Sequence, residues 1–121
     1  MRSLRILLVE DDASIVDLLA EVLEDLGHVV CAIERTEAGA VRSAIVHAPE
    51  LMIVDEVLGA GSGVAAMAAI ARIAPVPHIF MTGARSRHER GDDIVLYKPF
   101  IISDLVAAIG RASGVVPQAG F

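Results

Sequence analysis

The sequence is poor in several residue types that particular protein classes require. Aromatic residues make up only 3% of the 121 residues, and tryptophan is missing. The chain therefore has few aromatic side chains that could stack on nucleic-acid bases. The single cysteine, Cys31, excludes an intramolecular disulfide and a cysteine metal cluster. It lies in an apolar run, so we expect a small buried hydrophobe and not a reactive thiol.

Basic residues and long apolar runs are also scarce. The 10 Lys and Arg residues are outnumbered by 16 Asp and Glu residues, for a net charge of −6. This balance argues against nucleic acid or an anionic membrane as a direct partner. No apolar run approaches the roughly 20 residues that span a bilayer. The N-terminus has no signal-peptide pattern, and we expect a soluble cytoplasmic protein.

Short apolar segments with changing periodicity fill most of the chain. Apolar residues reach 55% of the sequence, which indicates one domain with an aliphatic core. Buried strands and amphipathic helices alternate, with Asp12 or Ser14 as candidate cap of the first helix and Ser103 as cap of the last. Residues 1–113 form the predicted domain and 114–121 a loose tail. The expected strands are Leu4–Val9, Val29–Ile33, Leu51–Asp55, Pro77–Thr82 and Ile94–Lys98. The main expected helices are Ile15–Leu26, Thr36–His47, Val64–Ile73 and one that starts at Ser103. In the second of these helices Ala38, Val41, Ala44 and Ile45 are expected to face inward, and in the last Leu105, Ala108, Ile109 and Ala112 are expected to share one side.

Repeated strand–helix alternation predicts an α/β domain with a mostly parallel, doubly wound sheet. The segment between Thr82 and Lys98 is the irregular part, because only 15 residues lie between them. They leave room for one or two helical turns at most, so the fourth helix is expected to be short or irregular. A ligand site in such a fold lies at the carboxyl ends of the strands.

Polar residues stand at the predicted carboxyl end of four strands. Glu10–Asp12 follow the first strand, Asp55 ends the third, Thr82 the fourth and Lys98 the fifth. Because the strands are parallel, these residues converge on one edge of the sheet. Each has an ordinary structural explanation when taken alone, such as a helix N-terminus, a turn or a strand exit. Their joint occurrence favours a functional site.

Clustered carboxylates repel one another unless a cation lies among them. Hard oxygen ligands select Mg²⁺, with Mn²⁺ as an alternative, and Mg²⁺ sites commonly take substrate phosphate as well. The lysine adds positive charge for phosphoryl oxygens, and the threonine hydroxyl adds a hydrogen bond. A carboxylate can itself attack phosphorus and form an aspartyl phosphate. The cluster therefore indicates a phosphate-handling site.

These residues resemble the response-regulator receiver domains. The match consists of Leu7-Leu8-Val9-Glu10-Asp11-Asp12, Asp55, Gly63 eight residues later, Thr82, and Lys98-Pro99-Phe100, and it covers about Leu4 to Ala112. The resemblance implies a CheY-like, flavodoxin-like (βα)5 fold with strand order 2-1-3-4-5. It also implies a single-domain response regulator in a two-component phosphorelay.

The resemblance further implies a role for each matching residue. Asp55 is the expected phosphoacceptor, Asp11 ligates Mg²⁺ directly, and Glu10 acts through water. The backbone carbonyl of Val57 is a further ligand. Thr82 binds the phosphoryl group and Lys98 pairs with Asp55 or its phosphate. The Lys98–Pro99 peptide is expected to be cis.

The sequence departs from the family pattern at the switch. Family members usually carry an aromatic residue three positions before the lysine, where this chain has Val95. Phe80-Met81-Thr82-Gly83-Ala84 partly resembles a receiver subclass with a Phe-Ala-Thr-Gly-aromatic signature and a short fourth helix. We expect Gly83 and the 84–92 loop to carry the activation change instead, as an order–disorder switch.

The expected partner is a sensor histidine kinase or a histidine phosphotransfer protein, and the chain is expected to be a monomer or weak dimer. It would not be an enzyme beyond its own phosphorylation and slow autodephosphorylation. A degenerate receiver acting only as a protein-binding module, or a phosphate sink, is the alternative.

A nucleotide-binding enzyme of this fold needs a glycine-rich or hydroxyl-rich loop where this chain has three acids. A dehalogenase-like phosphatase needs an acid where Val57 stands.

Overall fold

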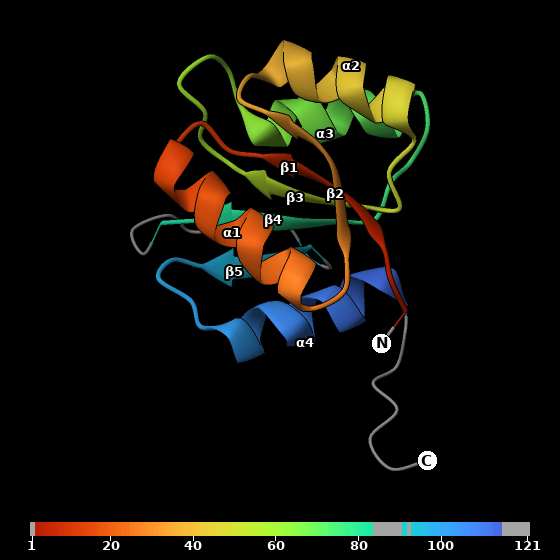
Figure 1. The fold of residues 1–121 in the computed structure, drawn as a ribbon. Coiled ribbons are helices and arrows are strands. Elements are labelled where there is room, and N and C mark those ends of the chain that lie inside the picture. Colours follow the sequence, from red (N-terminus) through yellow and green to blue (C-terminus); the bar gives the residue numbers. More distant parts are fainter. Residues whose placement is uncertain (1, 84–90, 92, 115–121) are drawn as a thin grey trace.

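The computed structural model describes residues 2–83, 91 and 93–114. Five strands form one parallel sheet in the order β2-β1-β3-β4-β5, as the sequence analysis predicted. Figure 1 shows this sheet between two pairs of helices. The elements in chain order are β1 (Arg5–Val9), α1 (Ala13–Asp25), β2 (Val29–Glu34), α2 (Glu37–His47), β3 (Leu51–Asp55), α3 (Gly63–Ala71), β4 (His78–Thr82), β5 (Ile94–Tyr97) and α4 (Ile102–Ser113).

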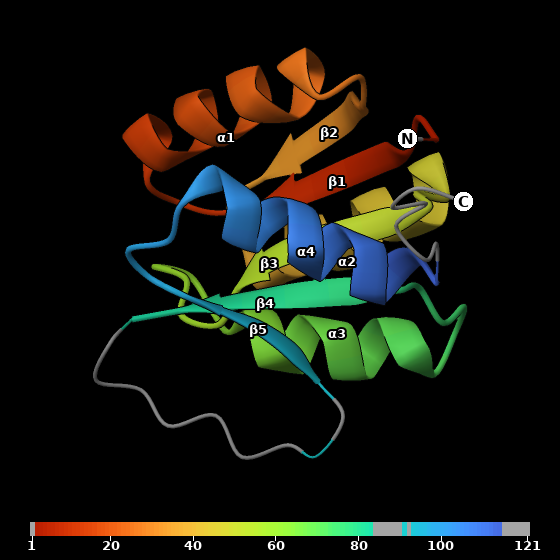
Figure 2. The same ribbon diagram turned by 90° about the horizontal axis from the view of Figure 1, so that it is seen from below.

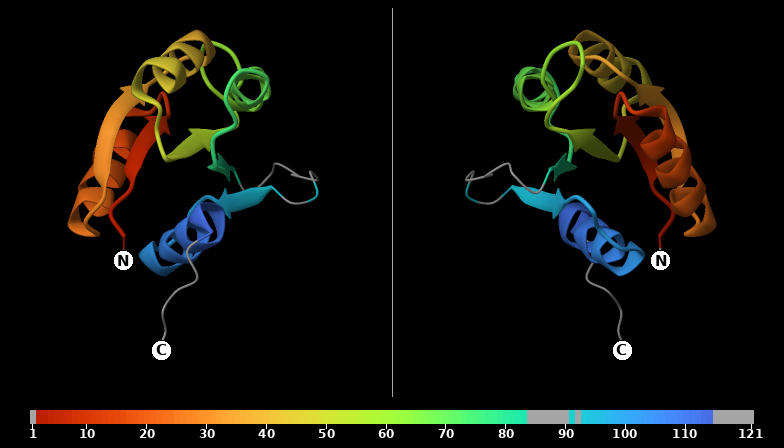
Figure 3. Two further views of the ribbon diagram at one scale, coloured as in Figure 1. Left: turned by 90° about the vertical axis from the view of Figure 1, so that its right-hand side faces the viewer. Right: turned by 90° about the vertical axis from the view of Figure 1, so that its left-hand side faces the viewer.

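Strand alternation divides the core into two layers. Successive side chains of a strand point to opposite faces of the sheet. Ile6 and Leu8 of β1 therefore pack with α1 and α4, whereas Leu7 and Val9 pack with α2 and α3. Figure 3 shows the helices on both sides of the twisted sheet, and in Figure 2 α4 lies in front of the sheet with α2 behind it. The central strand β3 is buried along its whole length, which fixes the position of its last residue, Asp55.

Short polar side chains start three of the helices. The Asp12 carboxylate accepts hydrogen bonds from the amides of Ser14 and Ile15, which confirms it as the cap of α1. Thr36 and Ser62 cap α2 and α3 in the same way. The prediction for the last helix was wrong, because α4 begins at Ile102 and Ser103 lies inside its first turn. The Asp104 carboxylate accepts the amide of Ile101 there, at 3.3 Å.

The buried face of α2 also differs from the prediction. Ala44 is buried, but Ala38 is exposed and Ile45 is 54% exposed. The residues that face the core are Gly39, Ala40, Ser43 and Ala44. These small side chains let α2 pack closely on the sheet and on α3. The sequence analysis missed this face because glycine and serine do not count as hydrophobic residues in a helical pattern. The Ser43 hydroxyl is not left unsatisfied, because it donates to the Glu34 carboxylate.

Two predictions fall outside the described residues. The short fourth helix, with the proposed switch loop at 84–92, lies mainly in positions that the structure does not describe. The same is true of the predicted tail beyond Gly114. Within the described ranges, no helix combines the length and the apolar character needed to cross a membrane.

Candidate functional site

The candidate site lies where the strands end. Asp55 is the last residue of β3 and Thr82 the last of β4, while Glu10 and Lys98 directly follow β1 and β5. The Lys98 amide donates to the Thr82 carbonyl at 2.8 Å, which continues the β4–β5 ladder into the site. The Lys98 ammonium lies 2.9 Å from a Glu10 oxygen and 2.8 Å from an Asp55 oxygen. The structure therefore brings the residues of three strands into direct contact.

Glu10 is the most buried acid of the cluster, with an exposed fraction of 1%. Burial raises the pKa of Glu10, the hydrogen bond from Lys98 opposes this rise, and the neighbouring Asp55 adds to it. Its second oxygen accepts the amides of Asp11 and Asp12 at 3.0 and 3.3 Å. Both oxygens of Glu10 thus have partners within the chain, which hold the carboxylate beside the other acids.

Lys98 forms ion pairs with two carboxylates at once. Burial by itself lowers the pKa of Lys98, but the hydrogen bonds to Asp55 and Glu10 outweigh it and the pKa is raised. The ammonium therefore stays charged at neutral pH. The sequence analysis assigned Lys98 to Asp55 alone, and the structure adds the contact with Glu10 as a second, fixed partner.

Asp55 is 8% exposed, and its two carboxylate oxygens have different partners. One accepts Lys98 at 2.8 Å, and the other accepts the amide of Val57 at 3.1 Å. The side chain therefore keeps a fixed orientation at the edge of the sheet.

The three acids Glu10, Asp11 and Asp55 fit the ligand set of a hard cation. One oxygen of each lies within 4.8 Å of the others, and Asp11 is exposed to solvent at the rim of the cluster. A carboxylate set with an open rim suits Mg²⁺, which retains several waters when bound. The Val57 amide faces Asp55, while its side chain is 70% exposed. The role of its carbonyl as a ligand stays a prediction.

Thr82 offers a hydroxyl that has no internal partner among the described residues. The residue is 1% exposed, and its Oγ1 forms no hydrogen bond within that part of the chain. Buried hydroxyls are normally bonded, and an exception calls for a functional explanation. A phosphoryl oxygen at Asp55 would supply the missing acceptor, since Thr82 ends the strand beside β3.

Gly63 lies directly against the backbone of Asp55. A Cβ atom at Gly63 would lie 1.9 Å from the carbonyl oxygen of Asp55 and 2.6 Å from a Val54 methyl group. No side chain can occupy this space, so α3 begins in direct contact with the backbone of Asp55. This explains physically why a glycine stands eight residues after the acid.

The remaining predicted residues occupy the sheet edge and β5. The Lys98–Pro99 peptide bond is cis, as expected. Gly83 follows β4, and a Cβ placed there would meet no atom of the described residues within 4 Å. Val95 pairs with Phe80 and packs on the α2–α3 side of the sheet. No aromatic side chain therefore occupies the usual switch position.

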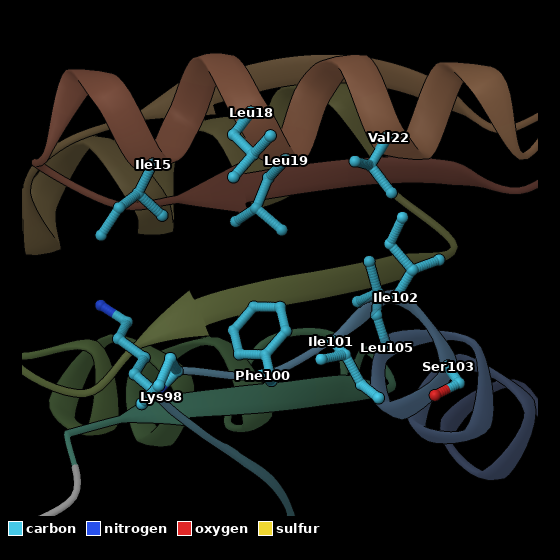
Figure 4. Close-up of a pocket in the computed structure, with 11 residues that line it drawn as sticks. Ile15, Leu18, Leu19, Val22, Lys98, Phe100, Ile101, Ile102, Ser103 and Leu105 are labelled. Carbon is cyan, nitrogen blue, oxygen red and sulfur yellow. The ribbon is translucent and has the colours of Figure 1, made fainter.

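A groove of about 880 Å³ opens beside the site between α1 and α4. Its lining is mostly apolar, with Lys98 at one end and Ser103 at the other (Figure 4). Leu18, Ile101 and Ile102 are 63%, 66% and 56% exposed. The sequence analysis missed this groove, because an apolar stripe on a helix does not reveal that part of it stays uncovered.

Comparison with known proteins identifies the family. The sequence profile of the response regulator receiver domain matches residues 6–110. The chain therefore belongs to the response regulator receiver domains.

Relatives and solved structures agree with this assignment. The chain is 37% identical to the transcriptional regulatory protein PdtaR of Mycobacterium tuberculosis over 114 residues, which cover 89% of this chain and 56% of that protein. It is 27% identical to the receiver domain of PhyR from Erythrobacter litoralis, with a TM-score of 0.80 and coverage of 97% and 96%. The response regulator PhyR of Brucella abortus gives a TM-score of 0.83 at 27% identity, over 93% of this chain and 49% of that one. The chain thus spans about half the length of the curated relatives it matches.

Proposed function

We propose that this receiver domain accepts a phosphoryl group on Asp55 from a phosphohistidine of a sensor histidine kinase or a phosphotransfer protein. The observation that carries the proposal is the Asp55 carboxylate, held by Lys98 and surrounded by Glu10 and Asp11 at ligand distance. A degenerate receiver that only binds proteins has no need for this arrangement. We also propose that the domain works in the cytoplasm and that its only catalysis is its own phosphorylation and dephosphorylation.

The transfer is an in-line displacement at phosphorus. An oxygen of ionised Asp55 attacks, the phosphorus–nitrogen bond of the phosphohistidine breaks, and the imidazole nitrogen leaves with the electron pair. Lys98 neutralises charge on the transferring oxygens, and Thr82 donates its free hydroxyl to one of them. Mg²⁺ held by Glu10, Asp11 and Asp55 would supply further charge neutralisation. Water later hydrolyses the acyl phosphate.

Mass spectrometry after incubation with acetyl phosphate and Mg²⁺ tests the phosphoacceptor. We expect the wild-type chain to gain the mass of one phosphoryl group and Asp55→Ala to gain none. Asp17→Ala, which removes an exposed aspartate from α1, serves as the matched control and should be phosphorylated like the wild type. A wild-type chain that gains no mass from acetyl phosphate or from histidine kinases would instead support the protein-binding module.

We further propose that the groove between α1 and α4 receives a helix of the phosphodonor. Lys98 lines the groove and also contacts the Asp55 carboxylate, so a partner seated there lies next to the acceptor. The exposed apolar side chains of the groove suit the apolar stripe of an amphipathic helix. The net charge of −6 favours a donor whose rim is basic.

A charge placed in the groove tests this docking surface. Leu18→Glu should slow transfer from a phosphohistidine donor of the wild-type chain by at least about tenfold, because it buries a charge at the interface. Its phosphorylation by acetyl phosphate, which needs no docking, should stay unchanged. Val46→Glu changes a residue that is 73% exposed on α2, and it should behave like the wild type in both assays. Equal transfer rates for Leu18→Glu and the wild type would contradict the docking proposal.

A further inference from the structure

The loop of residues 56–62 connects the phosphoacceptor strand to α3 and touches two acids of the site. Near its start, the Val57 amide donates to Asp55 at 3.1 Å. At its middle, the Gly59 amide donates to Asp11 at 2.6 Å. Both acids thus take part of their orientation from this loop. Whatever holds the loop in place also holds the acids.

The other side of the loop is held by the start of α2. The Ser62 amide donates to the Glu37 carboxylate at 2.9 Å, and the Glu37 amide donates to the Ala60 carbonyl at 3.1 Å. Gly61 has a φ of +100°, and a Cβ atom there would lie 2.6 Å from the Cβ of Glu37. Glycine is needed both for this backbone conformation and for this close approach. The loop is therefore built to lie directly against Glu37.

We infer that Glu37, which lies on α2 outside the acidic cluster, is a positioning residue of the phosphoacceptor site. Its carboxylate fixes the 56–62 loop from one side, so that the amides of Val57 and Gly59 stay on Asp55 and Asp11 on the other. Without this carboxylate, the loop must be ordered at the moment a cation or phosphoryl group binds, and binding weakens by that cost. The inference rests on the proposed function, because it assigns Glu37 to the same site.

The hydrogen bond, and not the charge of Glu37, is what the inference requires. Glu37→Gln removes the charge but keeps a side-chain oxygen that can accept the Ser62 amide. Glu37→Ala removes both. The backbone contact of Glu37 with Ala60 remains in each variant, so the loop loses one restraint and stays attached by another. The expected effect is therefore a several-fold change and not a complete loss.

Glu50 provides the matched control. Its carboxylate also accepts a backbone amide, that of Arg5, at 2.9 Å. Arg5 begins β1, so this bond lies at the amino ends of the strands, opposite the site. Glu50→Ala removes a charge, a hydrogen bond of the same type and an exposed ion pair with Arg2, without touching the 56–62 loop. It reports what a merely structural loss does to the measurements.

Calorimetric titration with Mg²⁺ alone tests the inference. We expect Glu37→Ala to raise the Kd for Mg²⁺ about three- to tenfold, the range set by the loss of one hydrogen bond. Glu37→Gln should restore a value close to the wild type, and Glu50→Ala should leave it unchanged. Wild-type Mg²⁺ affinity in Glu37→Ala, an equal loss in Glu50→Ala, or no Mg²⁺ binding by the wild-type chain would overturn the inference.

Phosphorylation kinetics with acetyl phosphate supply a second readout. Glu37→Ala should need about three- to tenfold more Mg²⁺ for the half-maximal rate, while the rate at saturating Mg²⁺ stays within about twofold of the wild type. A wild-type chain that binds Mg²⁺ but is never phosphorylated overturns the proposed function, and weaker Mg²⁺ binding by Glu37→Ala would still support the positioning role. A phosphorylated wild type with unchanged kinetics and affinity in Glu37→Ala overturns the positioning role alone.

Discussion

Replacing Lys98 by methionine tests the electrostatics of the site most directly. Methionine keeps an unbranched chain of similar length and removes the ammonium. Glu10, with an exposed fraction of 1%, and Asp55, with 8%, then face each other without a cation from the chain. Removing one partner of a buried ion pair costs about 3–5 kcal/mol. The Lys98 side chain is itself 25% exposed, so we reduce the expected loss of unfolding free energy to about 2–3 kcal/mol at pH 7.

The pH dependence of this loss identifies its cause. Burial and Asp55 raise the pKa of Glu10, and the variant lacks the lysine that opposes the rise. A carboxyl group whose pKa is higher in the folded than in the unfolded state binds its proton better when folded, so stability falls as pH rises through the folded pKa. The destabilisation of Lys98→Met should therefore be smallest below the ordinary pKa of a glutamate, 4.5, and should grow as pH rises above it. Added Mg²⁺ should reduce it at high pH.

Urea unfolding at several pH values measures the difference between variant and wild type. The matched control is Arg2→Met, which removes an exposed ion pair of 3.7 Å with Glu50 and should cost less than about 1 kcal/mol at any pH. Thermal unfolding at neutral pH should show a Tm lower by roughly 8–12 °C for Lys98→Met. A pH-independent loss, or one no larger than that of Arg2→Met, would refute the assignment of Lys98 as the counter-ion of buried Glu10.

Three further predictions follow from single contacts. Gly63→Ala should lower the unfolding free energy by at least about 3 kcal/mol in urea, because its Cβ would lie 1.9 Å from the Asp55 carbonyl oxygen. Gly83→Ala, whose Cβ would meet no atom of the described residues within 4 Å, should change it by less than about 1 kcal/mol. Thr82→Val should keep or raise the stability, since the Thr82 hydroxyl has no partner within the described residues. Phosphorylation of this variant by acetyl phosphate should nevertheless slow about tenfold, and a rate equal to the wild type would count against a contact between Thr82 and the phosphoryl group. Burial lowers the pKa of His28, whose Nδ1 accepts the Leu4 amide, so its contribution to stability should be complete above the ordinary pKa of about 6.5 and decline as pH falls below it. His28→Gln should flatten this part of the urea-derived stability profile, and an unchanged slope would exclude His28 as its source.

The site was predictable because its chemistry lies at the ends of strands. Apolar runs that stop at Asp55 or Thr82 fix both the strand and the edge of the sheet at which the polar residue emerges. Parallel pairing then brings those edges together without any further information. The Lys98–Glu10 contact was harder to predict, because it depends on which carboxylate the lysine reaches after the chain has folded.

The sequence did not reveal where small residues pack against the core. The inward face of α2 is formed by residues such as Gly39 and Ser43, which carry no hydrophobic signal. The start of α4 depends on Asp104 reaching back to Ile101, and Ser103 offered an equally good cap by residue type. The role of Glu37 rests on a loop conformation that needs a left-handed glycine, which no strand or helix pattern encodes.

The contact between Gly63 and the Asp55 carbonyl has a mechanical consequence. With no side chain between them, the first turn of α3 is in direct contact with the backbone of Asp55. The Gly63 amide also donates to the Glu56 carbonyl at 3.0 Å, which locks the residue after Asp55 to the same turn. If Asp55 is phosphorylated, any backbone shift there would therefore act directly on the first turn of α3.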